Sequence, residues 1–246
     1  MEGKRPDLGH AEAEVVFCEG DHVESLLRAK AEAGGRNFVL VSGNSDINFG
    51  DEFRALLPSS LRHWFGQNVL FEDPRVSPLP IGLENRYYGN SGKVERIERI
   101  KRLGGEKQTR IFCSFNVATN RREREPALAA ARRHPLGTGN ENRISIEEFQ
   151  TLMASCKFAL SPPGNGFDCH RTWEALYLGT VPIVKKSAWS DYFIRLGIPM
   201  LAVDSWDELA SFDESKLDDW YDAHRSGFSA EALFIDYWKT TIEGVS

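Results

Sequence analysis

The chain has 246 residues, of which 41% are hydrophobic and 27% are charged, and its formal net charge is -6. This length allows one large domain or two small ones, and we expect two. The ordinary composition excludes disordered, collagen-like and coiled-coil classes. The negative charge argues against a protein whose main task is to bind the phosphate backbone of nucleic acids.

The first 104 residues alternate between strand and helix patterns, which predicts a parallel sheet. The run 76–88 predicts a strand that leads into a proline-marked loop, and two glycines at 104–105 predict a hinge. The predicted strands begin at 14, 37, 69 and 76, and the predicted helices cover 21–35, 51–68 (one or two short helices, interrupted at Pro58) and 92–103.

After the hinge the alternation begins again, so we predict a second parallel sheet with right-handed crossovers. In such sheets ligands bind beyond the carboxyl ends of the strands. We expect three parts: an N-terminal domain at 1–104, a C-terminal domain at 105–226, and a helix at 227–246 that packs back on the first domain. The predicted strands lie at 109–116, 157–162, 180–184 and 199–203, and the predicted helices at 119–135, 145–156, 168–178, 190–197 and 229–244.

The four cysteines include no C-x-x-C pair, and three of them lie in apolar or strand-like runs. We therefore expect reduced, buried thiols and a cytoplasmic protein. The N-terminus has no apolar core of signal-peptide length, and no stretch reaches the roughly 18 apolar residues of a membrane span. The cysteines are Cys18, Cys113, Cys156 and Cys169.

A glycine-rich loop joins a predicted strand to a predicted helix in the segment SPPGNGFDCHRTWEALYLG, which starts at Ser161. A helix N-terminus attracts phosphate groups, and Gly164 and Gly166 allow a backbone to approach a ligand closely. We expect Asp168 to cap the helix. The loop lacks both the Lys-Ser or Lys-Thr pair of a P-loop and the dinucleotide glycine pattern, so these two nucleotide classes are disfavoured.

Arg171 and Glu174 are three residues apart, so they share one face of this helix. Arg171 can hold a diphosphate with two hydrogen bonds, and Glu174 can accept hydrogen bonds from the two hydroxyls of a ribose. The structural alternative is a solvated ladder of charges on the helix surface.

The segment FALSPPGNGFDCHRTWEALYLGTVPIV resembles the donor-binding motif of exostosin-like glycosyltransferases of the family 47 type. That motif has the form S/C-P-x-G-x-G-x-D, then H/F-R-x-(W/F)-E-A-L and G-x-(I/V)-P-(I/V). The segments NVLFEDPRVSPLPIGLEN and IFCSFNVATNRRERE are similar to the inter-domain region of compact bacterial and viral members. The resemblance implies a GT-B fold, in which two Rossmann-like domains face a central cleft, and catalysis without a metal or another cofactor.

By the same resemblance a nucleoside-diphosphate sugar binds the C-terminal domain, with Glu174 on the ribose and Arg171 on the diphosphate. A second basic cluster begins the helix after the strand at 109–116. Positive charge at a helix N-terminus calls for an anionic partner, although a solvated basic turn is the alternative. The expected donor-binding residues are Asn120, Arg121, Arg124, Ser161, Gly164, Asn165, Gly166, Asp168, Arg171 and Glu174.

An inverting sugar transfer needs a group that removes the proton of the acceptor hydroxyl. The candidates on the first domain are Asp46 and Glu84, each in a loop after a strand, and we prefer Asp46 because its loop is richer in polar groups. Either carboxylate could instead cap its own loop. His63, His170 and water are the remaining candidate bases.

The resulting expectation is a glycosyltransferase that moves a sugar, from a UDP-sugar by preference, to a glycan or lipid-linked acceptor. The alternatives are a fucosyltransferase-like enzyme with a GDP-sugar and a sugar-nucleotide-binding module without catalysis. Neither nucleic acid nor a membrane span is expected.

Overall fold

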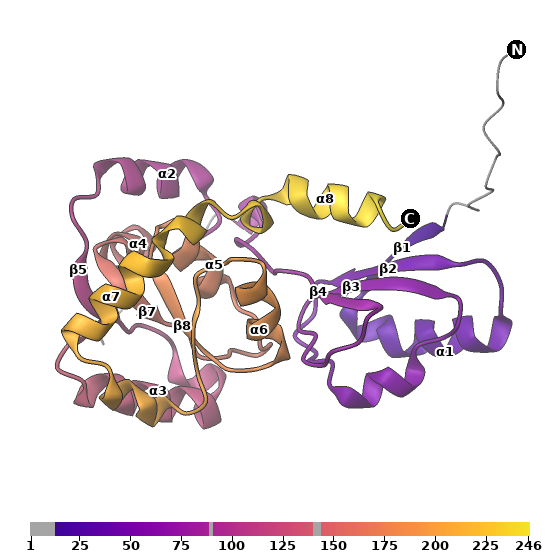
Figure 1. Ribbon diagram of the computed structural model, residues 1–246, viewed down its shortest axis with the longest axis horizontal. Coiled ribbons are helices and arrows are strands. Elements are labelled where there is room, and N and C mark those ends of the chain that lie inside the picture. Colours follow the sequence, from indigo (N-terminus) through magenta and orange to yellow (C-terminus); the bar gives the residue numbers. More distant parts are fainter. Residues whose placement is uncertain (1–12, 89–90, 140–143) are drawn as a thin grey trace, which may run out of the picture.

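Two parallel β-sheets with surrounding helices make up the computed structural model, which describes residues 13–88, 91–139 and 144–246 (Figure 1). Most of the N-terminal stretch that lacks a signal-peptide core lies outside the described residues. The strands are β1 (Glu14–Glu19), β2 (Phe38–Gly43), β3 (Leu61–Gly66), β4 (Val76–Pro78), β5 (Gln108–Phe112), β6 (Gly137–Thr138), β7 (Cys156–Leu160), β8 (Val181–Lys185) and β9 (Leu201–Val203).

Helices connect the parallel strands of both sheets. The α-helices are α1 (Val23–Ala33), α2 (Val94–Leu103), α3 (Arg121–Arg133), α4 (Ile146–Ala154), α5 (His170–Tyr177), α6 (Ala188–Arg195), α7 (Glu214–His224) and α8 (Ile235–Glu243). The 3-10 helices are η1 (Gly20–His22), η2 (Asp51–Leu56), η3 (Arg86–Tyr88), η4 (Val117–Thr119), η5 (Trp206–Ser211), η6 (Arg225–Ser229) and η7 (Glu231–Leu233).

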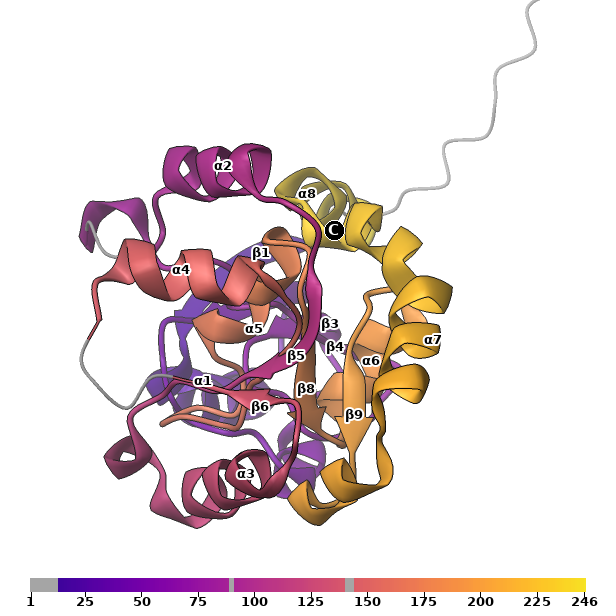
Figure 2. The ribbon, with the colours of Figure 1, turned by 90° about the vertical axis from the view of Figure 1, so that its left-hand side faces the viewer.

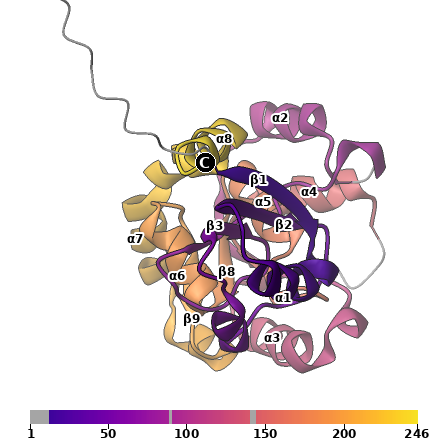
Figure 3. The ribbon, with the colours of Figure 1, turned by 90° about the vertical axis from the view of Figure 1, so that its right-hand side faces the viewer.

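The first unit contains the sheet β1-β2-β3-β4, whose strands follow chain order (Figure 1). Figure 3 shows β1, β2 and β3 from the side of this unit, together with α1. Because each strand is added on the same side of the one before it, right-handed connections place α1 and η2 on the same face of the sheet. On that face Leu27 and Phe53 pack with Trp64. On the other face Val39 and Phe65 contact Ile242 of α8. The C-terminal helix therefore covers part of a face that the crossovers leave open.

The second unit contains the sheet β6-β5-β7-β8-β9, which is covered on both faces. Side chains alternate along a strand, so Ile111 packs toward α3 and α7 while Phe112 packs toward α2 and α4. Figure 2 shows α2 and α4 together, well separated from α3 and α7. These observations confirm the predicted α/β class with two units, each built on a parallel sheet.

An aromatic cluster joins the two units. Trp173, Trp189 and Phe193 of the second unit pack with Leu79 and Ile81, which follow β4 in the chain. Each of the three aromatic side chains is at most 1% exposed. Replacing a buried Phe or Trp by alanine costs about 3–5 kcal/mol of stability. This contact therefore holds the two units in a fixed relative position.

Some predicted elements are wrong. Residues 61–66, predicted as helix, form the central strand β3, because hydrogen bonds to β2 and β4 outweigh the local preference. The predicted strand at 69–73 has only isolated bridges at Val69 and Asp73. The helix α7 was not predicted.

The predicted limits of 1–104, 105–226 and 227–246 stay predictions. The helix α2, which precedes the limit at 104, packs on the second sheet through Ile97 and Ile100. All four cysteines are free, but only Cys113 and Cys156 are buried. No helix among the described residues combines the length and apolar composition needed to cross a bilayer.

Candidate functional site

The candidate site lies where the strand order of the second sheet reverses. From β5 the chain moves to β6 at the edge, whereas from β7 it moves to β8 on the other side. Ligands of open α/β sheets bind beyond the carboxyl ends of the strands at such a point. Two loops meet there, 113–120 after β5 and the glycine-rich loop, 161–169, after β7.

Both glycines of the glycine-rich loop lie close to protein side chains. A Cβ atom on Gly164 would lie 2.8 Å from Arg124 Nη2, and one on Gly166 would lie 2.8 Å from Asn68 Nδ2. The loop closes on itself through a hydrogen bond of 3.0 Å from Gly164 N to Gly166 O. Asn165 stands exposed at its tip.

The start of α3 holds this loop from the other side. Asn120 caps α3 by accepting from Glu123 N, and its Nδ2 donates to Gly164 O at 2.9 Å. Arg124 is buried and donates from Nε to Pro163 O at 3.0 Å and from Nη1 to Asn116 O at 2.8 Å. These contacts make Asn120 and Arg124 supports of the loop.

Arg121 belongs to the same predicted cluster but lies apart from it. Its side chain is 74% exposed and forms an ion pair with Glu125 at 3.4 Å on the surface of α3. The structure therefore separates Arg121 from Asn120 and Arg124.

Arg171 has buried hydrogen-bond donors without a partner. Its Nε and Nη1 atoms are inaccessible to solvent and have no hydrogen-bond partner among the described residues. Its guanidinium lies 5.4 Å from the ring centre of Phe115, and that of Arg124 lies 5.7 Å from the same centre. Leaving a buried donor unsatisfied costs about 1–3 kcal/mol, and more for a charged group, so this position favours an anion.

The charges of Arg124 and Arg171, which both lie beside Phe115, also favour an anion at this position. Burial, and then the neighbouring Arg171, lower the pKa of Arg124. The hydrogen-bond partners of Arg124 described above are backbone carbonyls, which leave its charge uncompensated. Two adjacent guanidinium groups therefore create a positive potential at the carboxyl ends of β5 and β7.

A cavity of about 520 Å³ is lined in part by Phe115, the ring that lies beside both arginines. It lies between the carboxyl ends of β5 and β6 and the side of α3. A larger cavity of about 740 Å³ lies between the C-terminal end of α3 and the start of α7. The His134 ring at that second cavity already bonds Phe212 O and Leu136 N, and the cavity is remote from both loops.

Glu174 is buried, at 4% exposure, on the side of α5 that faces α4. Its Oε1 lies 3.5 Å from Nε2 of Gln150, which is fully buried. Gln150 also donates to Ser91 O at 3.0 Å and accepts from Arg96 Nε at 2.7 Å. Gln150 thus links Glu174 to Ser91 and Arg96, which lie between the two sheets in the chain, and no local pattern predicted this contact.

Asp168 does not cap α5, contrary to the prediction. The N-cap residue is Cys169, which makes no side-chain capping bond. The Asp168 carboxylate accepts instead from Ile81 N at 2.8 Å and from Trp173 Nε1 at 2.8 Å, and it is 3% exposed. Burial raises its pKa to about 7. Asp168 therefore ties the glycine-rich loop to the segment after β4.

Ser161 and the candidate histidines are also hydrogen-bonded within the protein. Ser161 Oγ lies 2.9 Å from Thr172 Oγ1 in the buried base of the loop. His170 Nδ1 donates to Gly82 O at 2.8 Å, because a carbonyl can only accept, which leaves Nε2 as the basic atom of the neutral ring. His63 lies 2.9 Å from Ser77 Oγ, and burial lowers its pKa.

The two candidate carboxylates of the first unit have different surroundings. Asp46 is exposed in the 44–48 loop after β2. Glu84 is half-buried, and its Oε2 accepts from Ser91 N at 2.9 Å. The 44–48 loop contacts the glycine-rich loop, since Phe167 N donates to Asn48 Oδ1 at 2.8 Å. The structure therefore brings the loop of Asp46 against the predicted donor loop.

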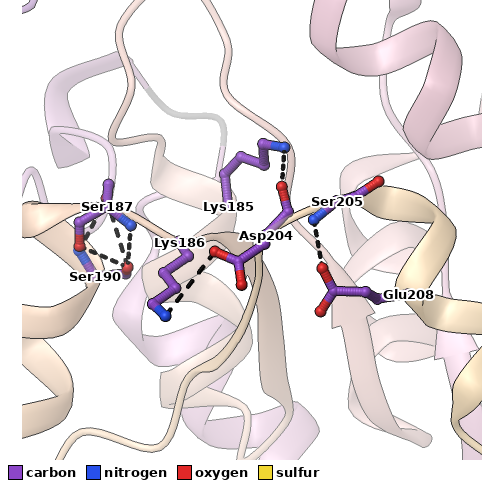
Figure 4. A network of polar contacts seen from close by, with 7 residues as sticks. All are labelled: Lys185, Lys186, Ser187, Ser190, Asp204, Ser205 and Glu208. Carbon is purple, nitrogen blue, oxygen red and sulfur yellow. Dashed lines mark hydrogen bonds and ion pairs between the residues drawn. The ribbon is translucent and has the colours of Figure 1, made fainter.

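The carboxyl ends of β8 and β9 form a separate polar network (Figure 4). Lys185 donates to Asp204 O at 2.6 Å, and Lys186 lies 3.9 Å from the Asp204 carboxylate. Ser187 with Ser190 caps α6, and Ser205 with Glu208 caps η5. These side chains bond one another, so this network stabilises the strand ends.

No group of three or more potential metal ligands of the His, Cys, Asp or Glu type occurs among residues 13–88, 91–139 and 144–246.

No family model and no curated protein matches this chain. Among solved structures, it is similar to an α,α-trehalose-phosphate synthase (UDP-forming) from Burkholderia vietnamiensis, with 10% identity, a TM-score of 0.43, and coverage of 95% of this chain and 75% of that one. It is also similar to a spinosyn rhamnosyltransferase complexed with spinosyn aglycone, with 13% identity, a TM-score of 0.40, and coverage of 94% and 69%. Similarities this weak do not determine what a chain binds.

Proposed function

We propose that this chain is a glycosyltransferase of the exostosin-like type that transfers a sugar from a nucleoside-diphosphate sugar, with UDP favoured, to a glycan or lipid-linked acceptor. The observation that carries the proposal is Arg171, whose buried Nε and Nη1 atoms have no partner among the described residues. A diphosphate has several oxygen atoms that could accept hydrogen bonds from this guanidinium, and guanidinium groups bind phosphate well.

The residues around Arg171 suit the remaining parts of such a donor. The charge of Arg124, beside the same Phe115 ring, adds to the potential that would stabilise a departing diphosphate. The Glu174 carboxylate, one helical turn further along α5, is an acceptor for the two ribose hydroxyls. Neither contact requires a metal ion.

The transfer step then needs a base on the first unit. The acceptor hydroxyl gives its proton to Asp46, with Glu84 as the rival, and its oxygen forms a bond to the anomeric carbon of the donor. The bond from that carbon to the diphosphate breaks on the opposite face, so the configuration inverts and the diphosphate leaves with the electron pair. Asp46 is the preferred base because its side chain is exposed, whereas Glu84 accepts from Ser91 N.

Binding of UDP-, GDP-, CMP- and dTDP-sugars, measured by calorimetry and thermal shift, tests the proposal. A ligand that binds only the folded chain stabilises it by about 2.7 kcal/mol at 100 times its Kd. We expect a UDP-sugar to bind, and Arg171→Ala to weaken it roughly 10- to 150-fold, the equivalent of a lost charged hydrogen bond of about 1.5–3 kcal/mol. Arg171→Lys recovers part of this, because lysine lacks the fork.

The matched control is Arg133→Ala, which removes the same charge from an exposed ion pair with Asp207 at the other end of α3. It should leave the affinity unchanged. Binding of a GDP-sugar alone would favour the fucosyltransferase-like alternative, and binding without any product would favour a module without catalysis. A wild-type chain that binds no nucleotide sugar would refute the proposal.

A further inference from the structure

Two asparagine side chains of the first unit hold consecutive backbone amides of the glycine-rich loop. Phe167 N donates to Asn48 Oδ1 and Asp168 N donates to Asn68 Oδ1, each at 2.8 Å. In sequence these pairs are 119 and 100 residues apart. The loop that carries the predicted donor site is therefore positioned partly by the other unit.

Asn68 also holds the 44–48 loop. Its Nδ2 donates to Ser45 O at 3.0 Å, and its backbone oxygen accepts from Phe49 N at 2.9 Å. The side chain is 1% exposed, so both of its hydrogen bonds are shielded from water. One buried amide thus contacts the loop of Asp46 and the glycine-rich loop at the same time.

The backbone conformation of Asn68 and the absence of a side chain at Gly166 both suit the contact between Asn68 and the glycine-rich loop. Asn68 has φ 55°, in the left-handed region that asparagine tolerates better than most residues. A Cβ atom on Gly166 would lie 2.8 Å from Asn68 Nδ2 and 3.0 Å from Oδ1. The absence of a side chain at Gly166 therefore allows the close approach of the loop to Asn68.

We propose that Asn68 is a positioning residue that sets the placement of the glycine-rich loop relative to the 44–48 loop, and so aligns the bound donor with the base. This inference rests on the proposed function, because a donor and a base on different units must meet with reacting atoms about 3–3.5 Å apart. The proposed donor contacts of Arg171 and Glu174 lie on the second unit, so the loss of Asn68 should lower turnover more than donor affinity.

The test uses Asn68→Gly, which keeps the left-handed backbone and removes both side-chain bonds. Its matched control is Asn44→Gly, since Asn44 also has a positive φ, 54°, but its side chain is exposed and lies 3.3 Å from Glu19. The first measurement is hydrogen exchange at the Asp168 amide. We expect exchange about tenfold faster in Asn68→Gly, the factor for about 1.4 kcal/mol of lost hydrogen bonding, and no change in Asn44→Gly.

The second measurement separates affinity from turnover. With the UDP-sugar as probe, we expect its Kd to change less than about threefold in Asn68→Gly, while the rate of UDP release falls at least about tenfold. A purely structural role would lower donor affinity and turnover together. Unchanged exchange at Asp168, or unchanged turnover with a UDP-sugar that the wild type uses, would overturn the inference.

A variant that does not fold and a wild type that binds no nucleotide sugar would each call for a different comparison. If Asn68→Gly does not fold, Asn68→Asp replaces it, because aspartate keeps the acceptor for Asp168 N, whereas its ionised form adds a buried charge and cannot donate to Ser45 O. Retained affinity with reduced turnover then supports the inference, and full turnover overturns it. If the wild type binds no nucleotide sugar, the proposed function fails, and the exchange measurement alone decides whether Asn68 joins the two loops.

Discussion

Replacing Asp168 by asparagine should remove a pH dependence of stability that the structure predicts. Burial raises the pKa of Asp168 to about 7 in the folded chain, against 3.8 for an ordinary aspartate. Between these values the folded chain holds a proton that the unfolded chain has lost. The contribution of Asp168 to stability is therefore greatest below about pH 4 and is lost as the pH rises to about 7.

The magnitude follows from the shift. About three pKa units at 1.36 kcal/mol each give roughly 4 kcal/mol of pH-dependent stability between pH 4 and 7. For a chain of this size that corresponds to about 8–16 °C in Tm. The Asp168→Asn variant cannot titrate at this position, so its curve of unfolding free energy against pH should lack this component.

Urea unfolding of both proteins at several pH values between 4.5 and 8 measures the difference. We expect the wild type to lose stability relative to Asp168→Asn by up to about 1.4 kcal/mol per pH unit. Asp218→Asn is a control with the opposite pH dependence. Hydrogen bonds from Lys157 and Thr109 lower the pKa of Asp218, so the contribution of Asp218 to the free energy of unfolding is lost as the pH falls. Parallel curves for the wild type and Asp168→Asn would refute the reasoning about burial.

Three further predictions concern the proposed reaction. Glu174→Gln should weaken donor binding at least about tenfold with an unchanged Tm, because an amide accepts fewer hydrogen bonds from a diol; calorimetry with the UDP-sugar decides, and unchanged affinity removes Glu174 from the site. Asp46→Asn should abolish product in mass spectrometry while donor affinity stays near wild type, with Glu84→Gln as the rival; an active Asp46→Asn beside an inactive Glu84→Gln moves the base to residue 84. EDTA should leave transfer intact, since Arg171 can hold the leaving group; activity that vanishes and returns with manganese contradicts this.

Local patterns were enough for much of the second unit. The apolar run before Ser161, the turn-forming loop and the helical spacing after it predicted β7, the glycine-rich loop and α5, because each of these elements is specified by neighbouring residues. The first unit was harder. The segment 61–66 lacks a strong strand pattern, and only pairing with β2 and β4 makes it a strand.

The contacts of the site depended on residues distant in the chain. The sequence placed Asp168 at the start of a helix, where a cap is the common role, but the folded chain brings Ile81 N to its carboxylate. It also offered no signal that Asn68 would contact Asp168 N or that Gln150 would lie beside Glu174. Hydrogen bonds between such distant residues exist only when the elements that carry them are packed together.

By itself the sequence determined the α/β class, the two parallel sheets and the position of the glycine-rich loop at a strand end, because hydrophobic periodicity and turn residues act over a few positions. Only the tertiary structure decided which charges are satisfied. Arg121 and Arg171 are the same residue type near the start of a helix, yet one pairs with Glu125 in water and the other has buried donors without a partner among the described residues, beside Phe115. That difference arises from burial, which depends on how the elements pack and not on the residues nearby in sequence.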